Sequence, residues 1–454
     1  MQWFEQTSSR PAVKPSQTRG LSSLLAFPPA LPAPLVGPGC ACHPGRVAGE
    51  WKNWSGSVQC SPRRQHRPRD ADEVATILRR AHERGGTVRP LGAGHSSMPL
   101  VATDDELVSL ERMTGVLAVD AAAGTAEVLP GTPMDELGAQ LVERGVAIDN
   151  YGDVDYQAIA GAIGTGTHGS GARLGNLSSI LVGGTLVTGT GEAVRFTRDG
   201  HDASADLGQD ALLPAAQVSL GALGIFTSLT LRVRPAYELH RTNWMTHIDW
   251  VLEHFHELVE ANRCFDFYWY PRSDLAQVRM LNEPGDEPGI RPPGELRREE
   301  TGPSYEILPN DRHLRFEEME HMLPLDPELR AFREVRERVK AKHRTRVGWR
   351  VLVRTIAADD AMLSGAQGRP TMTIALLHNA SLPHEHYFGD MEPLLLEHGG
   401  RPHWGKKHTM RAAQLAPLYL RWNEFARVRE ALDPDGVLRN EHLSELLIGS
   451  SEGA

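Results

Sequence analysis

Five glycines fall within the eleven positions from Gly161 to Gly171, and this density constrains the fold more than any other stretch of the sequence. Glycine has no Cβ, so it lets the backbone adopt positive φ or approach a neighbouring group closely. Consecutive turn amides in such a loop also form a concavity that suits a phosphate group. We therefore expect the backbone of this segment, and not its side chains, to be pressed against another group.

The same segment satisfies the dinucleotide-binding pattern G-x-G-x-x-G through Gly164, Gly166 and Gly169. That motif should follow a strand and open a helix, with an acidic residue about 20 positions later at a strand end. Here the preceding residues look helical, and the following residues are rich in turn formers. We therefore reject a Rossmann domain.

A second glycine-bearing loop lies upstream, in Val88 to Ser97. Residues compatible with a strand run into Pro90 and are followed by Gly92-Ala93-Gly94 and then His95. A histidine at the lip of such a loop could be reached by a bound group, even covalently. The alternative is an ordinary strand-to-loop turn with a surface histidine.

A third distinctive segment is the turn from Arg401 to His408, which reads Arg-Pro-His-Trp-Gly-Lys-Lys-His. Its histidine, tryptophan and lysine could aim a cation and a π surface into one pocket. The alternative is a basic surface loop.

Composition excludes several classes of partner. The 454 residues carry a net charge of -10, which argues against nucleic acid and against an anionic membrane surface. No apolar run approaches the roughly 18 residues of a membrane span. The four cysteines are unevenly placed, and the Cys40 and Cys42 pair has no matching second pair, so we expect neither a disulfide framework nor a metal site.

Residues 1–48 read as a tail that is disordered or left over from an over-long start. Prolines interrupt its apolar part, which suits neither a signal-peptide core nor a helix. We expect a cytoplasmic protein, with export or peripheral membrane association as the alternatives.

The length of the chain, 454 residues, indicates two domains. Helix patterns at 70–84 and 132–144 and strand patterns at 180–187 and 225–233 make up a first α+β unit. From Tyr237 the sequence pattern changes to that of a second α+β unit. We expect helices at 249–262, 327–342, 386–398 and 422–432, and strands at 264–270, 349–356 and 371–378. Residues 283–303 read as a polar, proline-rich excursion. The predicted fold class is α+β, with domains at 49–236 and 237–454.

Together these segments resemble the FAD-linked aldonolactone and alditol oxidoreductases (L-gulono-1,4-lactone and D-arabinono-1,4-lactone oxidase-like) of the vanillyl-alcohol-oxidase superfamily. The resemblance runs from about Trp51 to Leu447. Residues 88–97 resemble the first flavin loop, 157–171 the pyrophosphate loop, 221–227 a third flavin segment, and 403–406 the C-terminal His-Trp-Gly-Lys signature. It implies a two-subdomain, PCMH-type FAD-binding domain, a mixed-sheet cap over the flavin, and a last helix that returns to the first domain.

The resemblance also implies FAD bound covalently through His95 and a sugar lactone or polyol substrate. The activity it implies is oxidation of an alcohol by hydride transfer to flavin N5. The implied catalytic residues are Lys406 and Arg354, whose cations would stabilise negative charge, and His378. The implied cofactor-binding residues are Pro90, Gly92, Ala93, Gly94, His95, Ser96, Ser97, Gly152, Asp153, Ala158, Gly161, Thr165, Gly166, Thr167, His168, Gly224, Ile225, His403 and Lys406.

Two positions bear on the type of reaction. Gly152 would leave room for O2 beside the flavin, which favours an oxidase that releases H2O2 over a dehydrogenase with another acceptor. Relatives that oxidise polyols often carry Glu-x-Arg where this chain has Leu352 and Arg354. His378 on the next strand is the expected substitute for the missing carboxylate, with a structural histidine as the alternative.

Three other classes of protein are alternatives to a flavin-dependent oxidoreductase. A metalloenzyme lacks ligand spacing such as H-E-x-x-H, although the chain has 20 histidines. A serine hydrolase lacks G-x-S-x-G. Leu352, which stands in place of a carboxylate, would favour a flavoprotein without catalytic activity.

Overall fold

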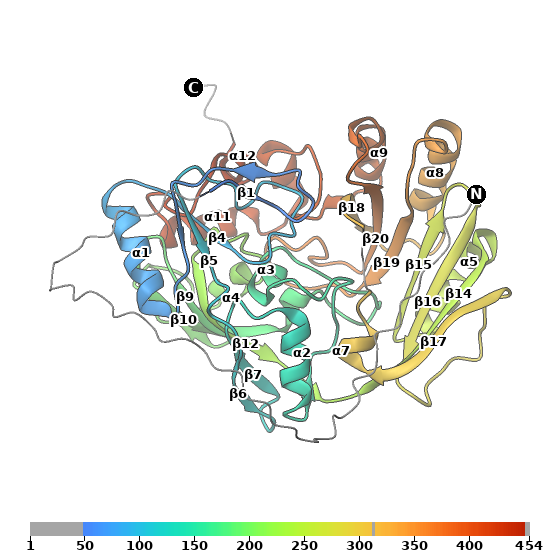
Figure 1. Cartoon of the computed structure of the whole chain (residues 1–454), viewed down its shortest axis with the longest axis horizontal. Coiled ribbons are helices and arrows are strands. Elements are labelled where there is room, and N and C mark those ends of the chain that lie inside the picture. The colour runs from blue at the N-terminus through green and yellow to red at the C-terminus, as the bar shows by residue number, and fades with distance from the viewer. Residues whose placement is uncertain (1–48, 311–313, 450–454) are drawn as a thin grey trace, which may run out of the picture. The chain divides into compact units, whose positions relative to one another are not determined.

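The computed structural model describes residues 49–310 and 314–449. The predicted tail at 1–48 lies outside the described residues. Helices and strands are mixed along the described chain, so the α+β prediction is confirmed (Figure 1). Within these ranges no helix is both long and apolar enough to cross a lipid bilayer.

A small parallel sheet positions the first glycine loop. Its strands, in spatial order, are β3 (Arg64–His66), β5 (Glu106–Ser109) and β4 (Val88–Leu91). Helix α1 (Ala71–Glu83) joins β3 to β4, and the side chain of Asp70 caps its first turn by accepting a hydrogen bond from the backbone N of Glu73. The buried face of α1 shares a small apolar core with β4, β5 and two strands of the next sheet, and the glycine loop begins at the end of β4.

An antiparallel six-stranded sheet forms the rest of the first half. Its strands, in spatial order, are β11 (Gly200–His201), β10 (Ala193–Thr197), β9 (Leu181–Val187), β12 (Ile225–Arg232), β7 (Thr125–Val128) and β6 (Val116–Asp120). Helices α2 (Met134–Val142), α3 (Ile159–Gly164) and α4 (Leu212–Ala216) share one apolar core with this sheet. Two-stranded pairs join β1 (Trp51–Lys52) to β2 (Gln59–Cys60) and β8 (Val146–Ala147) to β13 (Arg234–Pro235).

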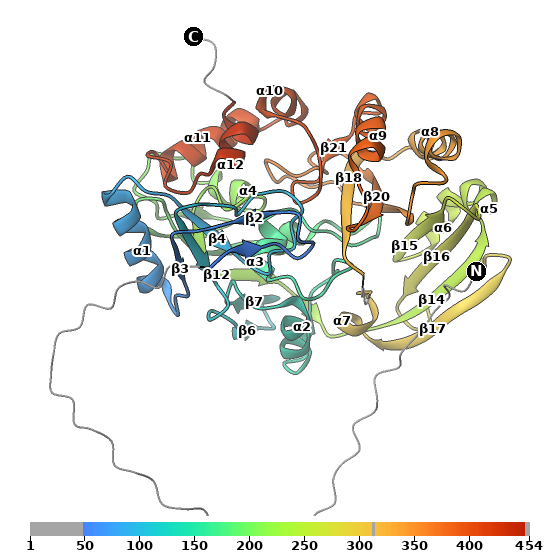
Figure 2. The same cartoon turned by 45° about the horizontal axis from the view of Figure 1, so that its top comes forward.

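An antiparallel eight-stranded sheet forms the second half (Figures 1 and 2). Its strands, in spatial order, are β17 (Glu295–Pro303), β14 (Glu238–His247), β16 (Leu275–Asn282), β15 (Cys264–Tyr270), β19 (Val351–Ile356), β20 (Thr371–Asn379), β18 (Phe316–Pro324) and β21 (Arg401–Pro402). Helices α5 (Ile248–Glu253), α6 (Phe255–Ala261), α8 (Arg330–Arg338) and α9 (Glu385–Glu397) cover one face. Because side chains alternate along a strand, the other face turns towards the glycine loops.

The chain ends by packing against its first half. Helix α11 (Trp422–Leu432) lies against α4, and α12 (Glu441–Leu447) packs against α10 (Ala412–Leu415) (Figure 2). All strands of the six-stranded sheet precede Tyr237, and all strands of the eight-stranded sheet follow it. The sheets therefore divide close to the predicted boundary, while the division into domains stays a prediction.

Five strands of the second sheet were not predicted, and one of them is the two-residue β21 at the start of the predicted turn at 401–408. β14 and β16 lie between predicted elements, and β17 occupies the end of the stretch at 283–303 that we expected to be an excursion. β17 is an edge strand, mostly exposed and rich in Arg and Glu, so it lacks an apolar pattern. β18 is almost wholly buried but carries three glutamates and a histidine, which hid its strand pattern.

A buried arginine holds the first glycine loop against two other parts of the chain. The guanidinium of Arg89, in β4, donates hydrogen bonds to the carbonyl oxygens of Leu100, Leu220, Gly221 and Leu438. Burial lowers the pKa of Arg89 to about 9. These four acceptors join β4 to the loop before β12 and to the C-terminal segment.

Replacing Arg89 by Met should leave these buried carbonyls without donors. We expect a loss of about 3–5 kcal/mol in the free energy of unfolding, measured by urea denaturation. Arg64→Met is the matched control, because the Arg64 side chain is 54% exposed and its substitution should cost less than about 0.5 kcal/mol. Equal losses in the two variants would show that the Arg89 hydrogen bonds do not hold these segments together.

Candidate active site

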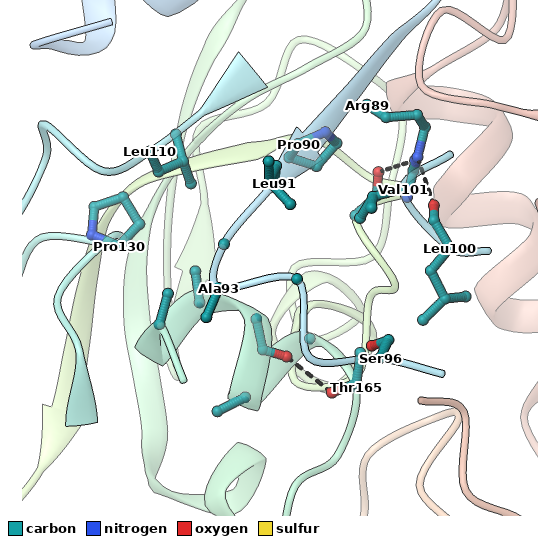
Figure 3. A pocket seen from close by; sticks show the side chains of 18 of the residues that line it. Arg89, Pro90, Leu91, Ala93, Ser96, Leu100, Val101, Leu110, Pro130 and Thr165 are labelled. Carbon is teal, nitrogen blue, oxygen red and sulfur yellow. Dashed lines mark hydrogen bonds between the residues drawn. The ribbon is translucent and has the colours of Figure 1, made fainter. Parts of the chain in front are cut away.

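A cavity lies where the three glycine-bearing segments meet (Figure 3). Its walls come from residues 89–96 after and within β4, residues 157–165 around α3, and residues 219–226 at the start of β12. Segments distant in sequence therefore meet around one cavity.

Backbone lines much of this cavity because several of its residues lack a Cβ. A Cβ placed on Gly161 would have no atom within 4 Å, so this α-carbon faces open space. Gly94 has a φ of +65°, and a Cβ there would lie 2.9 Å from the Trp51 ring. A Cβ on Gly92 would lie 3.0 Å from the Cβ of Ala158. The cavity thus offers bare backbone to a ligand along two of its walls.

Only part of the glycine cluster from Gly161 to Gly171 serves the cavity. Gly161 and Gly164 line it, whereas Gly166, Gly169 and Gly171 do not. Gly166 and Gly171 have φ values of +71° and +135°, and a Cβ on Gly169 would lie 2.2 Å from a backbone oxygen. These three glycines are required by the local conformation and packing of the chain.

A second cavity adjoins the first. The two cavities share His95, Ser96, Gln157 and Thr165. Beyond these residues the second cavity lies between the glycine loops and the free face of the eight-stranded sheet. A group bound in the first cavity could therefore reach the second past His95.

Three charged or titratable residues are buried together at the second cavity. Arg354 on β19 donates to the Glu320 carboxylate on β18 at 2.5 Å and to the backbone oxygen of His168 at 3.1 Å. The Nε2 atom of His168 lies 3.2 Å from the same carboxylate. Burial opposes ionisation of Glu320, but Arg354 and His168 outweigh it and hold the pKa of Glu320 well below its usual range. The other oxygen of Glu320, Oε2, has no hydrogen-bond partner among the described residues.

The His-Trp-Gly-Lys segment runs along β18. His403 and Lys407 donate backbone hydrogen bonds to the carbonyl oxygens of Glu320 and Glu318. Lys406 between them forms an ion pair with the Glu318 carboxylate. Burial lowers the pKa of His403 to about 3, so its imidazole is neutral. This segment thus places a cation beside the carboxylates of β18.

Most of the predicted site residues line one of the two cavities. In the first are Pro90, Gly92, Ala93, Gly94, His95, Ser96, Ala158, Gly161, Thr165, Gly224 and Ile225. In the second are Asp153, Thr167, His168, Arg354, His403 and Lys406, with His95, Ser96 and Thr165 shared. Ser97 lies outside both linings and donates its backbone N–H to Gly405.

The prediction that His378 replaces the missing carboxylate is wrong. His378 follows Ile374 and Leu376 on the face of β20 that the helices cover, and its ring packs against Tyr387 of α9. Its neighbours Ala375 and Leu377 are the residues that turn towards the cavity side. A strand reverses its side-chain direction at each residue, so His378 cannot reach the second cavity.

The structure gives Gly152 a packing role that differs from the predicted one. Gly152 lines neither cavity, and a Cβ placed on it would lie 2.8 Å from the Thr167 side chain. Thr167 itself lines the second cavity. Glycine at this position therefore allows Thr167 to pack closely.

Both carboxylates of β18 that line the cavity were absent from the predicted site residues. Phe316, Glu318 and Glu320 alternate with residues of the opposite face, and all three line the second cavity. The period of two was visible in the sequence as Phe-Glu-Glu-Met-Glu. Buried glutamates lack the apolar signal on which strand prediction depends.

One group among the described residues has the side chains of a metal site. Ligand atoms of His168, Glu320 and His403 lie within 4.8 Å of one another. Arg354 already pairs with this carboxylate, so a metal cation would meet a neighbouring positive charge. The group is therefore better suited to ion pairing and hydrogen bonding than to metal binding.

Three further histidines lie buried around the same segment. His408 is electrostatically coupled to His321 on β18 and to His442 on α12. Burial lowers their pKa values to about 3 for His408 and about 4 for His321 and His442. Each has at least one ring nitrogen with no hydrogen-bond partner within 49–310 and 314–449. All three are therefore neutral near pH 7.

Comparison with known proteins gives matches over most of the chain. The model of the D-arabinono-1,4-lactone oxidase family matches residues 229–296 and 291–446, and that of an FAD-binding domain matches residues 62–197. An L-gulono-1,4-lactone dehydrogenase of Mycobacterium tuberculosis is 34% identical over 87% of this chain and 99% of its own. An alditol oxidase of a Streptomyces species is 29% identical over 87% and 99% of the two chains.

Solved structures agree with the fold. A cholesterol oxidase from B. sterolicum superposes with a TM-score of 0.75, covering 88% of this chain and 96% of that one. The two share 15% sequence identity, so the likeness is one of fold alone.

The buried histidines should make stability depend on pH. Their folded pKa values lie below the ordinary 6.5, so the unfolded chain binds more protons as the pH falls from about 6.5 towards 4. We expect the free energy of unfolding to fall over this range, by about 1.4 kcal/mol per pH unit for each histidine. His408→Asn should reduce this slope in urea denaturation, whereas the exposed His256→Asn should not. An unchanged slope in His408→Asn would mean that His408 titrates normally in the folded protein.

Proposed function

Because this chain belongs to the family of FAD-linked aldonolactone and alditol oxidoreductases, we propose that it oxidises an aldono-1,4-lactone, such as L-gulono- or D-arabinono-lactone, or an alditol. It is an FAD-dependent oxidoreductase that acts on CH–OH groups. The observation that carries the proposal is the junction of the two cavities at His95, where a cradle of bare backbone meets a polar pocket.

The residues of the first cavity fit FAD. Its pyrophosphate needs backbone amide donors and no clashing side chains, which the open surface at Gly161 and the loop at 92–96 offer. When bound, FAD supplies the redox chemistry, taking two electrons and the hydrogen of the substrate's alcohol carbon. His95, which lines both cavities, is the residue that we propose as its covalent tether.

The second cavity supplies the groups that bind and orient the substrate. Arg354 and Lys406 provide positive charge where the substrate oxygen loses its proton. Glu318 and Glu320 partner these cations and keep the cavity close to electrically neutral. Burial of the pairs strengthens their interactions with a bound hydroxyl.

Two electron acceptors are compatible with this reaction. Our proposal is an oxidase that passes electrons to O2 and forms H2O2, which the names of the matching D-arabinono-1,4-lactone oxidase family and of the alditol oxidase relative support. The second candidate is a dehydrogenase with another acceptor. Two observations favour the dehydrogenase. The relative that is 34% identical is named a dehydrogenase, and Gly152, where we expected room for O2, lines neither cavity.

The activity is tested by anaerobic reduction of the purified, FAD-loaded protein. We expect an aldonolactone or an alditol to bleach the flavin absorption, because the substrate carbon transfers its hydrogen to FAD. Admitting air should then restore the colour within seconds for an oxidase and much more slowly for a dehydrogenase. A flavoprotein that none of these compounds bleaches would contradict the proposed function.

In the same assay, the Lys406→Met variant should retain FAD. Its flavin should be reduced by substrate roughly 100-fold more slowly, because the variant lacks the cation that stabilises negative charge in the reaction. The neighbouring Lys407→Met is the matched control, since Lys407 lies outside both cavity linings and near Glu317. Equal rates for Lys406→Met and the unaltered protein would remove Lys406 from the reaction.

The tether is tested without any substrate. We expect the yellow colour to stay with the protein pellet after acid precipitation, because a covalent bond survives unfolding. In His95→Ala the flavin should move to the supernatant, whereas in the control His247→Ala, an exposed position, it should stay in the pellet. Free FAD from the unaltered protein would contradict the covalent link and leave the FAD site itself unaffected.

A further inference from the structure

The cavity beside the sheet contains an acceptor that no residue of the described chain satisfies. Oε1 of Glu320 accepts a hydrogen bond from Arg354 and lies near His168. Oε2 is buried and has no hydrogen-bond partner within residues 49–310 and 314–449. Glu320 is 1% exposed and lines the second cavity. A buried carboxylate oxygen without a donor is costly, so this atom is suited to a ligand that brings one.

Strand register places Glu320 opposite an apolar wall. Leu352 on β19 pairs with Ala375 on β20, and Ala375 pairs with Glu320 on β18. The three residues therefore share one row and one face of the sheet. Neighbouring strands lie about 4.8 Å apart, so Leu352 and Glu320 stand roughly 10 Å from each other with the small Ala375 between them.

Leu352 makes the cavity wall apolar at the position where a carboxylate would otherwise stand. Leu352 belongs to a cluster with Phe316, Tyr268 and Leu377, and Leu352 and Phe316 both line the cavity. The Nζ of Lys406 lies 5.8 Å from the ring centre of Phe316. The lining thus combines charged side chains with an apolar patch of Leu352 and Phe316.

We propose that Glu320 accepts the hydrogen bond of a substrate hydroxyl, and that the wall of Leu352 and Phe316 receives an apolar face of the same substrate. This inference rests on the proposed function and deepens it. A carboxylate therefore still lies beside Arg354, although position 352 carries a leucine. That carboxylate belongs to Glu320 on β18, which is two strands away from Leu352 on β19.

The two walls favour one class of substrate. A ring-closed lactone can turn one hydroxyl-bearing edge to Glu320 and a C–H face to Leu352 and Phe316. An open-chain alditol carries a hydroxyl on every carbon, so some of its hydroxyls would lie against the apolar wall without partners. Each buried hydroxyl left without a partner should weaken binding roughly tenfold or more. The pocket therefore selects the lactone.

The first test replaces Glu320 by Gln, which keeps the shape and removes the charge. We expect kcat/KM for a hydroxylated aldonolactone to fall roughly 10- to 100-fold in anaerobic flavin reduction. Binding of γ-butyrolactone, which has the ring but no hydroxyl, should be unchanged when followed through the flavin absorption spectrum. Glu317→Gln, on the opposite face of β18, is the matched control for both measurements.

These readouts separate a binding role from a structural one. If Glu320 only neutralised Arg354, its loss would weaken both lactones to the same extent, and that result would overturn the inference. Full activity of Glu320→Gln would also overturn it. Failure of γ-butyrolactone to bind the unaltered protein at any soluble concentration would contradict the role of the apolar wall.

The second test places a carboxylate on that wall. In Leu352→Glu, the ratio of kcat/KM for an alditol to that for an aldonolactone should rise about 100-fold, because an alditol hydroxyl gains an acceptor and the ring loses its apolar contact. An unchanged ratio would overturn the inference. Failure of the proposed function itself would differ from this, because neither class of compound would then bleach the unaltered flavoprotein.

Discussion

A buried ion pair on the eight-stranded sheet is hydrogen-bonded to the glycine loop that faces it. Arg354 reaches from β19 to Glu320 on β18 and, in the other direction, to the backbone of His168 in the glycine loop. Removing either charge would leave the other buried and uncompensated, which is far more costly than loss of an exposed pair. The segment at 403–407 is hydrogen-bonded along the same strand, so the cation of Lys406 depends on the position of β18 as well.

This arrangement explains why the binding chemistry is divided between two halves of the chain. The first half provides bare backbone, which can hold a large cofactor but offers few charged groups. The second half provides paired charges on a rigid sheet, where cross-strand register fixes which side chains meet. His95 stands where the two surfaces join, so the cofactor and the substrate share one boundary.

Much of this could be predicted from the sequence because glycine and turn chemistry are local signals. The loops at 92–96, 157–165 and 221–226 follow from such signals, whereas the placement of Arg354 and Lys406 in one pocket was implied by the family resemblance. Glu318 and Glu320 could not be found in this way, because their strand is buried yet charged and depends on partners far away in sequence. The error at His378 has the same origin: its strand was predicted, but the direction of its side chain is set by the helices that cover the sheet.

The central claim is that the two adjoining cavities bind one cofactor and one substrate. A crystal structure of the FAD-loaded protein with an aldonolactone bound tests it most directly. We expect FAD along the cavity at 89–96 and 157–165, with the lactone between Arg354, Lys406 and Glu320 and its ring against Leu352. FAD bound elsewhere, or a lactone without contact to any of these side chains, would contradict a shared site for the cofactor and the substrate.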